Sequence, residues 1–131
     1  MTKLSRKPLS NEKLGLLVNN IWLAFLSMKT KEEMRVLFRD LFTHTEYKML
    51  AKRLEVARRL IDGEHYEEIS RELNISEKTI AHVSNILAQK GEGLRKAHNN
   101  LKGLEQKFRK KTSTKFPRYK GMPHLSELIK A

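Results

Sequence analysis

A run of polar side chains between residues 76 and 85 has the types and spacing that contact with a nucleic acid requires. Its members are Ser76, Glu77, Lys78, Thr79, His82 and Asn85. On one helix, Lys78 can donate to guanine or to a phosphate, and Thr79 can touch a base or a thymine methyl. His82 and Asn85 can donate further along, and Ser76 would cap the positive end of the helix, which suits a phosphate. The pattern predicts a DNA-contacting helix, although any solvent-exposed helix also displays polar residues.

A second group of basic residues lies near the end of the chain and is interleaved with aromatic residues. The candidate phosphate contacts in it are Lys107, Arg109, Lys110, Lys111, Lys115, Arg118 and Lys120. Residues 88–131 hold 12 basic and 3 acidic residues, whereas residues 1–87 hold 15 basic and 12 acidic residues. We expect this basic tail to follow the phosphates of a nucleic acid. The alternative is a solvated extension that touches nothing.

The composition favours one domain with an anionic partner. The chain has 131 residues and a net charge of +12, which indicates binding to nucleic acid or to a lipid surface. It contains no cysteine, which excludes disulfides, thiolate zinc sites and cysteine catalysis. The longest apolar stretch, Ile21 to Leu26, is too short to span a bilayer, and no signal-peptide core opens the chain. We therefore expect a cytoplasmic protein without a membrane partner.

Catalytic, metal and cofactor signatures are weak in this sequence. The five histidines form no ligand cluster and no helical i, i+4 pair, so no metal site is expected. Gly91 and Gly93 are an incomplete dinucleotide-binding fingerprint that follows a helix pattern rather than a strand pattern. We find no nucleophile elbow, phosphate loop or pair of catalytic carboxylates. An enzyme is the least favoured class, and no cofactor is expected.

The elements that must position these residues are predicted to be helices. Apolar residues recur at helical spacing from Ser10 to about Met28, and two capping boxes, Thr30 with Glu33 and Thr43 with Glu46, each begin a further helix. Gly63 ends the second of these, two short helices follow at about 66–73 and from Ser76, and a last helix follows Gly91 and Gly93. No segment alternates with period two. The sequence predicts an all-α fold of about six helices.

The two short helices fit a helix-turn-helix between residues 67 and 87. Asn74 tolerates the left-handed backbone that the central turn needs, and Ser70 supplies the small side chain expected where the helices cross. The apolar residues that would lock the two helices together are Ile69, Leu73, Ile75, Ile80 and Val83. The second short helix then carries the polar run described first.

The apolar faces exceed what one small core can cover. The segments from Leu14 to Leu26 and from Leu94 to Phe108 each present a wide apolar stripe. We expect dimerisation to bury them. The alternative is that the stripes fold back on one another within one chain.

The segment from Leu41 to Leu87 resembles the trp repressor superfamily, particularly its YerC/YecD-type branch. The likeness is carried by LFTHTEYKMLAKRLEVARRLIDGE, the helix-turn-helix and SNIL, and helix order extends it from Leu14 to Phe108. Response-regulator output domains share a phrase like ISEKTI, but they lack the long helix between Thr43 and Gly63. The resemblance implies a trp repressor-like intertwined homodimer whose helix-turn-helix units meet successive major grooves. It also implies repression by operator occupancy and leaves room for a small corepressor.

The sequence departs from the family where the corepressor would bind. Trp repressors hold tryptophan between an arginine of the long helix and an arginine of the recognition helix, beside a glycine. Arg53 matches the first, but His82 stands at the second and Val83 replaces the glycine. The candidate effector pocket is thus Arg53 with His82, and we do not expect tryptophan in it, because Val83 occupies the space of the indole and a neutral imidazole cannot clamp a carboxylate. A solvated role for Arg53 is the alternative.

These observations predict three regions: a basic N-terminal arm at 1–10, the helix-turn-helix domain at 11–109 and a basic C-terminal tail at 110–131. The predicted function is a homodimeric, sequence-specific transcriptional regulator, expected to be a repressor, which binds double-stranded DNA on the nucleoid. One alternative is a nonspecific nucleic-acid binder that uses the tail. Another is a helical adaptor that uses its helix-turn-helix for protein contacts.

Overall fold

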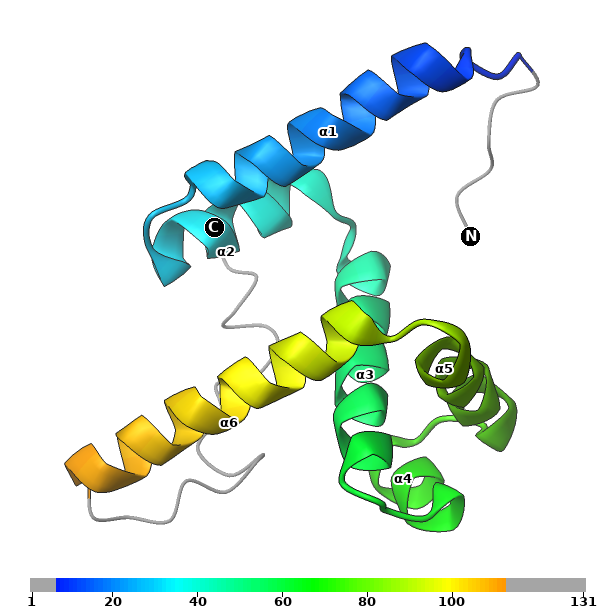
Figure 1. Cartoon of the computed structure of the whole chain (residues 1–131), viewed down its shortest axis with the longest axis vertical. Coiled ribbons are helices and arrows are strands. Elements are labelled where there is room, and N and C mark those ends of the chain that lie inside the picture. The colour runs from blue at the N-terminus through cyan, green and yellow to red at the C-terminus, as the bar shows by residue number, and fades with distance from the viewer. Residues whose placement is uncertain (1–6, 113–131) are drawn as a thin grey trace.

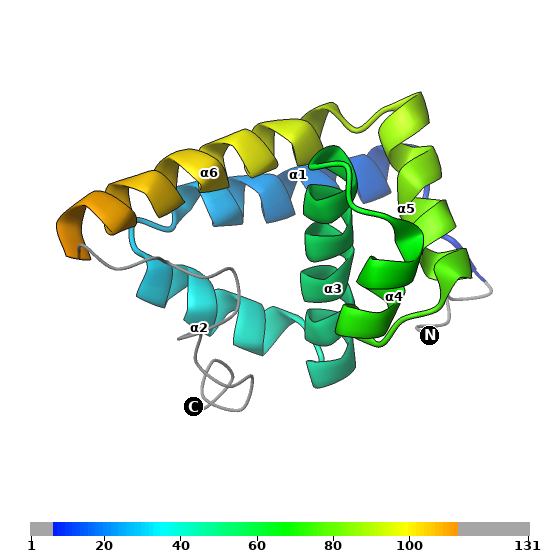
Figure 2. The same ribbon diagram turned by 90° about the horizontal axis from the view of Figure 1, so that it is seen from below.

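The computed structural model describes residues 7–112, with side chains through residue 107. These residues form an all-α chain, as predicted (Figure 1). The helices are α1 (Asn11–Ser27), α2 (Lys31–Leu41), α3 (His44–Ile61), α4 (Tyr66–Leu73), α5 (Glu77–Gln89) and α6 (Glu92–Thr112). The long helix α3 is central, with α4 and α5 on one side of it and α2 and α6 projecting from the other (Figures 1 and 2). None of the described helices is long and apolar enough to cross a lipid bilayer.

The predicted capping residues begin the first three helices, with one difference. Thr43 and Glu46 form a full capping box, in which the Glu46 backbone N–H donates to Thr43 Oγ1 at 3.1 Å and the Thr43 backbone N–H donates to Glu46 Oε1 at 3.0 Å. At α2, the Glu33 carboxylate instead accepts from the backbone N–H of Lys29, one residue before the cap, at 2.7 Å. The predicted box of Thr30 and Glu33 is therefore wrong in its reciprocal half, because the glutamate reaches one residue too far.

Two glycines with positive φ end α3 and α5. Gly63 has φ +84°, and the N–H groups of Gly63 and Glu64 donate to carbonyls in the last turn of α3. Gly91 has φ +79°, and a Cβ atom there would lie 2.8 Å from the Leu87 Cα. α6 begins directly after Gly91, so Gly93 lies inside this helix and does not precede it as predicted.

The core lies where α3, α4 and α5 meet. Its buried apolar residues are Val56, Ala57, Ile69, Ile80, Val83 and Leu87. Leu60 and Ile61 of α3, Leu73, Ile75 and Leu94 pack around them. Because four of the six buried residues belong to α4 and α5, the core mainly fixes the helix-turn-helix on α3.

Buried polar residues tie α6 to α3, which the sequence analysis did not foresee. Arg58 Nε donates to His98 Nδ1 at 3.1 Å, and the Arg58 guanidinium also pairs with Glu105 at 2.7 Å. The proton of the neutral His98 ring therefore lies on Nε2, which is 2.9 Å from Asp62 Oδ1. Lys102 pairs with the same Asp62 oxygen at 3.0 Å. These contacts join helices that lie about 40 residues apart in sequence.

The first helix stands away from the core. Phe25 of α1 stacks on Phe38 of α2 with ring centroids 5.0 Å apart, and Phe38 also meets Tyr47 of α3. The remaining large apolar side chains of α1 are exposed, namely Leu14, Leu16, Leu17, Ile21, Trp22, Leu23 and Leu26. On α6, Leu104 is also exposed. The alternative in which these stripes cover one another within one chain is not what the described residues show.

Candidate nucleic-acid interface

The turn between α4 and α5 has the geometry of a helix-turn-helix. Asn74 adopts the predicted left-handed backbone, with φ 52° and ψ 55°. Ser70 does more than leave space, because its hydroxyl donates to the Ile75 carbonyl at 2.6 Å, while the Ile75 N–H donates to the Ser70 carbonyl at 3.2 Å. These two bonds close the turn and fix the direction in which α5 leaves it.

α5 begins at a well-defined cap. Ser76 Oγ accepts from the Thr79 backbone N–H at 3.2 Å and lies 3.0 Å from Thr79 Oγ1. The cap therefore holds both the first turn of α5 and the hydroxyl of one of its candidate base-contacting residues. This local order follows directly from the serine at the N-cap position.

α5 separates a buried face from a polar face. Ile80, Val83 and Leu87 point into the core. The predicted contact residues are all exposed, namely Ser76, Glu77, Lys78, Thr79, His82 and Asn85. α5 lies at the outer edge of the molecule, away from α2 and the far end of α6 (Figures 1 and 2). One face of α5 is thus fixed by its packing on the core, and the polar face is accessible to a partner.

A small hollow between α3 and α5 contains both candidate effector residues. Its volume is about 90 Å³, and it is lined by Met49, Lys52, Arg53, Val56, Ile75, Thr79, His82 and Val83. Arg53 and His82 are therefore neighbours in space, as the family pattern suggested. Val83 is only 1% exposed and closes the inner wall. A hollow of this size is well below the roughly 300 Å³ at which small-molecule pockets begin.

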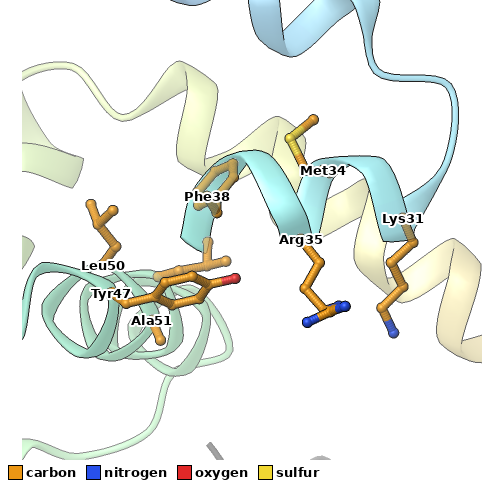
Figure 3. Close-up of a pocket in the computed structure, with 8 residues that line it drawn as sticks. Lys31, Met34, Arg35, Phe38, Tyr47, Leu50 and Ala51 are labelled. Atoms are coloured by element: carbon orange, nitrogen blue, oxygen red, sulfur yellow. The ribbon is translucent and has the colours of Figure 1, made fainter. Parts of the chain in front are cut away.

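A larger apolar groove lies between α2 and α3 and was not predicted. Its volume is about 370 Å³, and it is lined by Lys31, Met34, Arg35, Phe38, Tyr47, Leu50, Ala51 and Leu54. Figure 3 shows Lys31 and Arg35 at one end, with Phe38 and Tyr47 toward the other. Arg35 pairs with Glu32, and this contact lowers the pKa of the Glu32 carboxyl. The sequence signal for this groove is the helical spacing of the apolar residues in α2 and α3 that line it.

The predicted basic tail lies mostly outside the described residues. Lys107 is exposed near the end of α6. The α6 backbone continues to Thr112, so Lys110 and Lys111 occupy helical positions beyond the predicted domain boundary at residue 109. The side chains of Arg109, Lys110 and Lys111 lie outside the described residues, as do Lys115, Arg118, Lys120 and residues 1–6 of the N-terminal arm. Contact of this tail with DNA stays a prediction.

Metal ligands are not grouped within the part of the chain that the structure describes. No set of three or more histidine, aspartate or glutamate side chains is placed to hold an ion there. His98 serves instead as a buried hydrogen-bonding link between α3 and α6.

Comparison with known proteins points to one family. A family model described as Trp repressor protein matches residues 17–102, which spans α2 to α5 and parts of α1 and α6. A protein of Bacillus subtilis (strain 168), described as "Uncharacterized protein YerC", is 36% identical to this chain over 88 residues. The match covers 67% of this chain and 85% of that protein. No solved structure matches the chain.

Proposed function

Because this chain belongs to the Trp repressor family of DNA-binding regulators, we propose that it is a sequence-specific transcriptional regulator that binds DNA through α5. The observation that carries the proposal is the division of α5 into a buried face and an exposed polar face. A helix that is backed by a rigid core and begins at a capped turn can enter the major groove without reorganising.

The polar face of α5 supplies chemistry for base contacts. Lys78 can donate to guanine or to a phosphate, and Thr79 can contact a thymine methyl or donate through its hydroxyl. His82 and Asn85 extend the surface by one and two turns. We propose that these side chains distinguish one duplex sequence from another, and that the bound protein represses by occupying its operator on the nucleoid.

We propose further that the protein acts as a homodimer. The exposed apolar residues of α1 and Leu104 of α6 support this, because exposed stripes of this extent usually mark an interface. Two copies would place two α5 helices about one helical turn of DNA apart, roughly 34–36 Å. The operator would then have two-fold symmetry.

We do not expect tryptophan to act as a corepressor of this protein. The hollow beside Arg53 and His82 has a volume of about 90 Å³, and Val83 fills its inner side. We propose that the protein binds its operator without a tryptophan corepressor. Calorimetry with millimolar tryptophan should then show no saturable heat.

Selection from a random duplex library with the full-length protein tests the proposed function. The wild type should enrich a palindromic site, and Lys78→Ala and Thr79→Ala should each cost roughly 1–3 kcal/mol of preference for that site over random DNA. Lys29→Ala, in the loop before α2, is the control, since it removes an exposed lysine that lines neither the hollow beside α5 nor the groove between α2 and α3. If both α5 variants keep the full preference, α5 does not contact the bases and a protein-interaction role is favoured. If the wild type binds all duplexes equally, it is a nonspecific binder.

A further inference from the structure

The helix-turn-helix of this protein has a net negative charge, which does not favour binding to the phosphates of DNA. Residues 66–89 contain four carboxylates, those of Glu67, Glu68, Glu72 and Glu77, against two cations, those of Arg71 and Lys78. This stretch has a formal charge of −2 in a chain of +12. Phosphate neutralisation supplies most of the nonspecific affinity for DNA. Cations outside α4 and α5 must therefore provide most of it.

Two such cations lie on α3 and face the beginning of α5. Lys52 and Arg53 line the small hollow together with Thr79 and His82 of α5, so their side chains flank the candidate base-contacting surface. Both are exposed. Within the part of the chain that the structure describes, no ion pair or hydrogen bond engages either side chain.

The other arginines of α3 are committed elsewhere. Arg58 is buried against His98 and Glu105, and Arg59 is buried against three carboxylates. α3 thus divides its cations between internal ion pairs at its C-terminal end and uncommitted charges beside α5.

We propose that Lys52 and Arg53 form a phosphate-contacting shoulder, which holds the DNA backbone next to the bases that α5 contacts. The proposal rests on the proposed function. A guanidinium can bind two phosphate oxygens at once, and an ammonium on a flexible stem can reach a neighbouring phosphate. The hollow itself, at about 90 Å³, is well below the size of small-molecule pockets, so a bound small molecule does not compete with this role.

The test compares full-length Lys52→Gln and Arg53→Gln with the wild type on the selected duplex and on a random duplex over a range of salt concentrations. Each variant should weaken both duplexes by the same factor, about 8-fold at 0.1 M salt, and flatten the plot of log affinity against log salt by about 0.9 for each lost phosphate contact. Preference between the duplexes should not change. Circular dichroism verifies that the helices are intact.

Lys29→Gln is the matched control, because it removes an exposed charge that lines neither the hollow beside α5 nor the groove between α2 and α3. An equal loss in Lys29→Gln would show that the effect depends only on net charge, and it would overturn the shoulder. An unchanged salt slope in both α3 variants would also overturn the shoulder. If the wild type still prefers the selected duplex, the proposed function is unaffected by that result. If the wild type shows no preference between the two duplexes, the proposed sequence-specific function is contradicted, whatever the α3 variants do.

A last arm distinguishes duplex phosphate from free phosphate. Inorganic phosphate titrated into the DNA-free protein at constant ionic strength should give no saturable heat. Saturable binding that Arg53→Gln abolishes would make the shoulder a small-anion site and overturn its assignment to the DNA backbone.

Discussion

Arg59 links α3 to the loop and the helix α4 that follow it, and so fixes the start of the helix-turn-helix. Its side chain is 5% exposed, and its guanidinium pairs with Glu55 on its own helix, with Glu64 in the following loop and with Glu72 on α4. The contact with Arg59 lowers the pKa of the Glu72 carboxyl. Three carboxylates from three successive segments thus share one cation.

Replacing Arg59 with methionine should therefore cost much more than the loss of one surface ion pair. The substitution removes the buried cation that the three carboxylates share, and we expect a loss of about 3–5 kcal/mol in the free energy of unfolding. Arg39→Met, which breaks the exposed pair with Asp40, is the control and should cost about 1 kcal/mol or less. Urea unfolding followed by circular dichroism measures both. Equal losses in the two variants would contradict a special role for Arg59.

Residues that act locally could be predicted from the sequence, whereas residues that act across the fold could not. Asn74 was identified because a left-handed turn residue has a recognisable local context. Arg58 and His98 were missed, because their hydrogen bond joins positions 40 residues apart and no sequence spacing reports it. The contact of Lys78, Thr79, His82 and Asn85 with DNA stays a prediction, although their exposure on α5 agrees with it.

At the scale of elements, helix starts were predicted best because they depend on two or three neighbouring residues. The caps at Ser10, Thr43 and Ser76 are all present. The errors arose where two local signals competed. The Glu33 carboxylate accepts from the backbone N–H of Lys29 and not from that of Thr30. Gly91 alone ends α5, so Gly93 lies within α6.

The capping box of α3 should make stability depend on pH. Bonds from Thr43 lower the pKa of the Glu46 carboxyl below its ordinary value of 4.5. Because the folded-state pKa is below the unfolded one, this stabilisation is complete above pH 4.5 and is lost as the pH falls through the lowered pKa. Glu46→Gln keeps a hydrogen-bonding partner for Thr43 but does not titrate. Urea midpoints between about pH 3 and 6 should fall less steeply in this variant, and identical pH profiles would contradict the argument.

At the scale of the whole molecule, the sequence indicated more apolar surface than one core could bury, and the structure shows where it lies. The core joins α3, α4 and α5, while α1 contacts α2 through the stacked pair of Phe25 and Phe38. Leu26 of α1 is 81% exposed and Trp22 is 61% exposed. The groove between α2 and α3 adds a second apolar surface. The number of copies that share these surfaces could not be derived from the pattern of one chain.

We predict that a second copy covers them. Sedimentation at micromolar concentration should give about twice the chain mass of 15.3 kDa. Trp22 is the only tryptophan, so its emission should be at shorter wavelength in the dimer and should shift to longer wavelength on dilution. Leu17→Asp places a charge on the main apolar stripe of α1 and should shift both measurements toward the monomer. Asn19→Asp adds the same charge on the nearly opposite side of the helix and should have a smaller effect. A wild type that sediments as a monomer with solvent-exposed Trp22 emission would contradict the dimer, and a footprint without two-fold symmetry would contradict paired α5 helices on the operator.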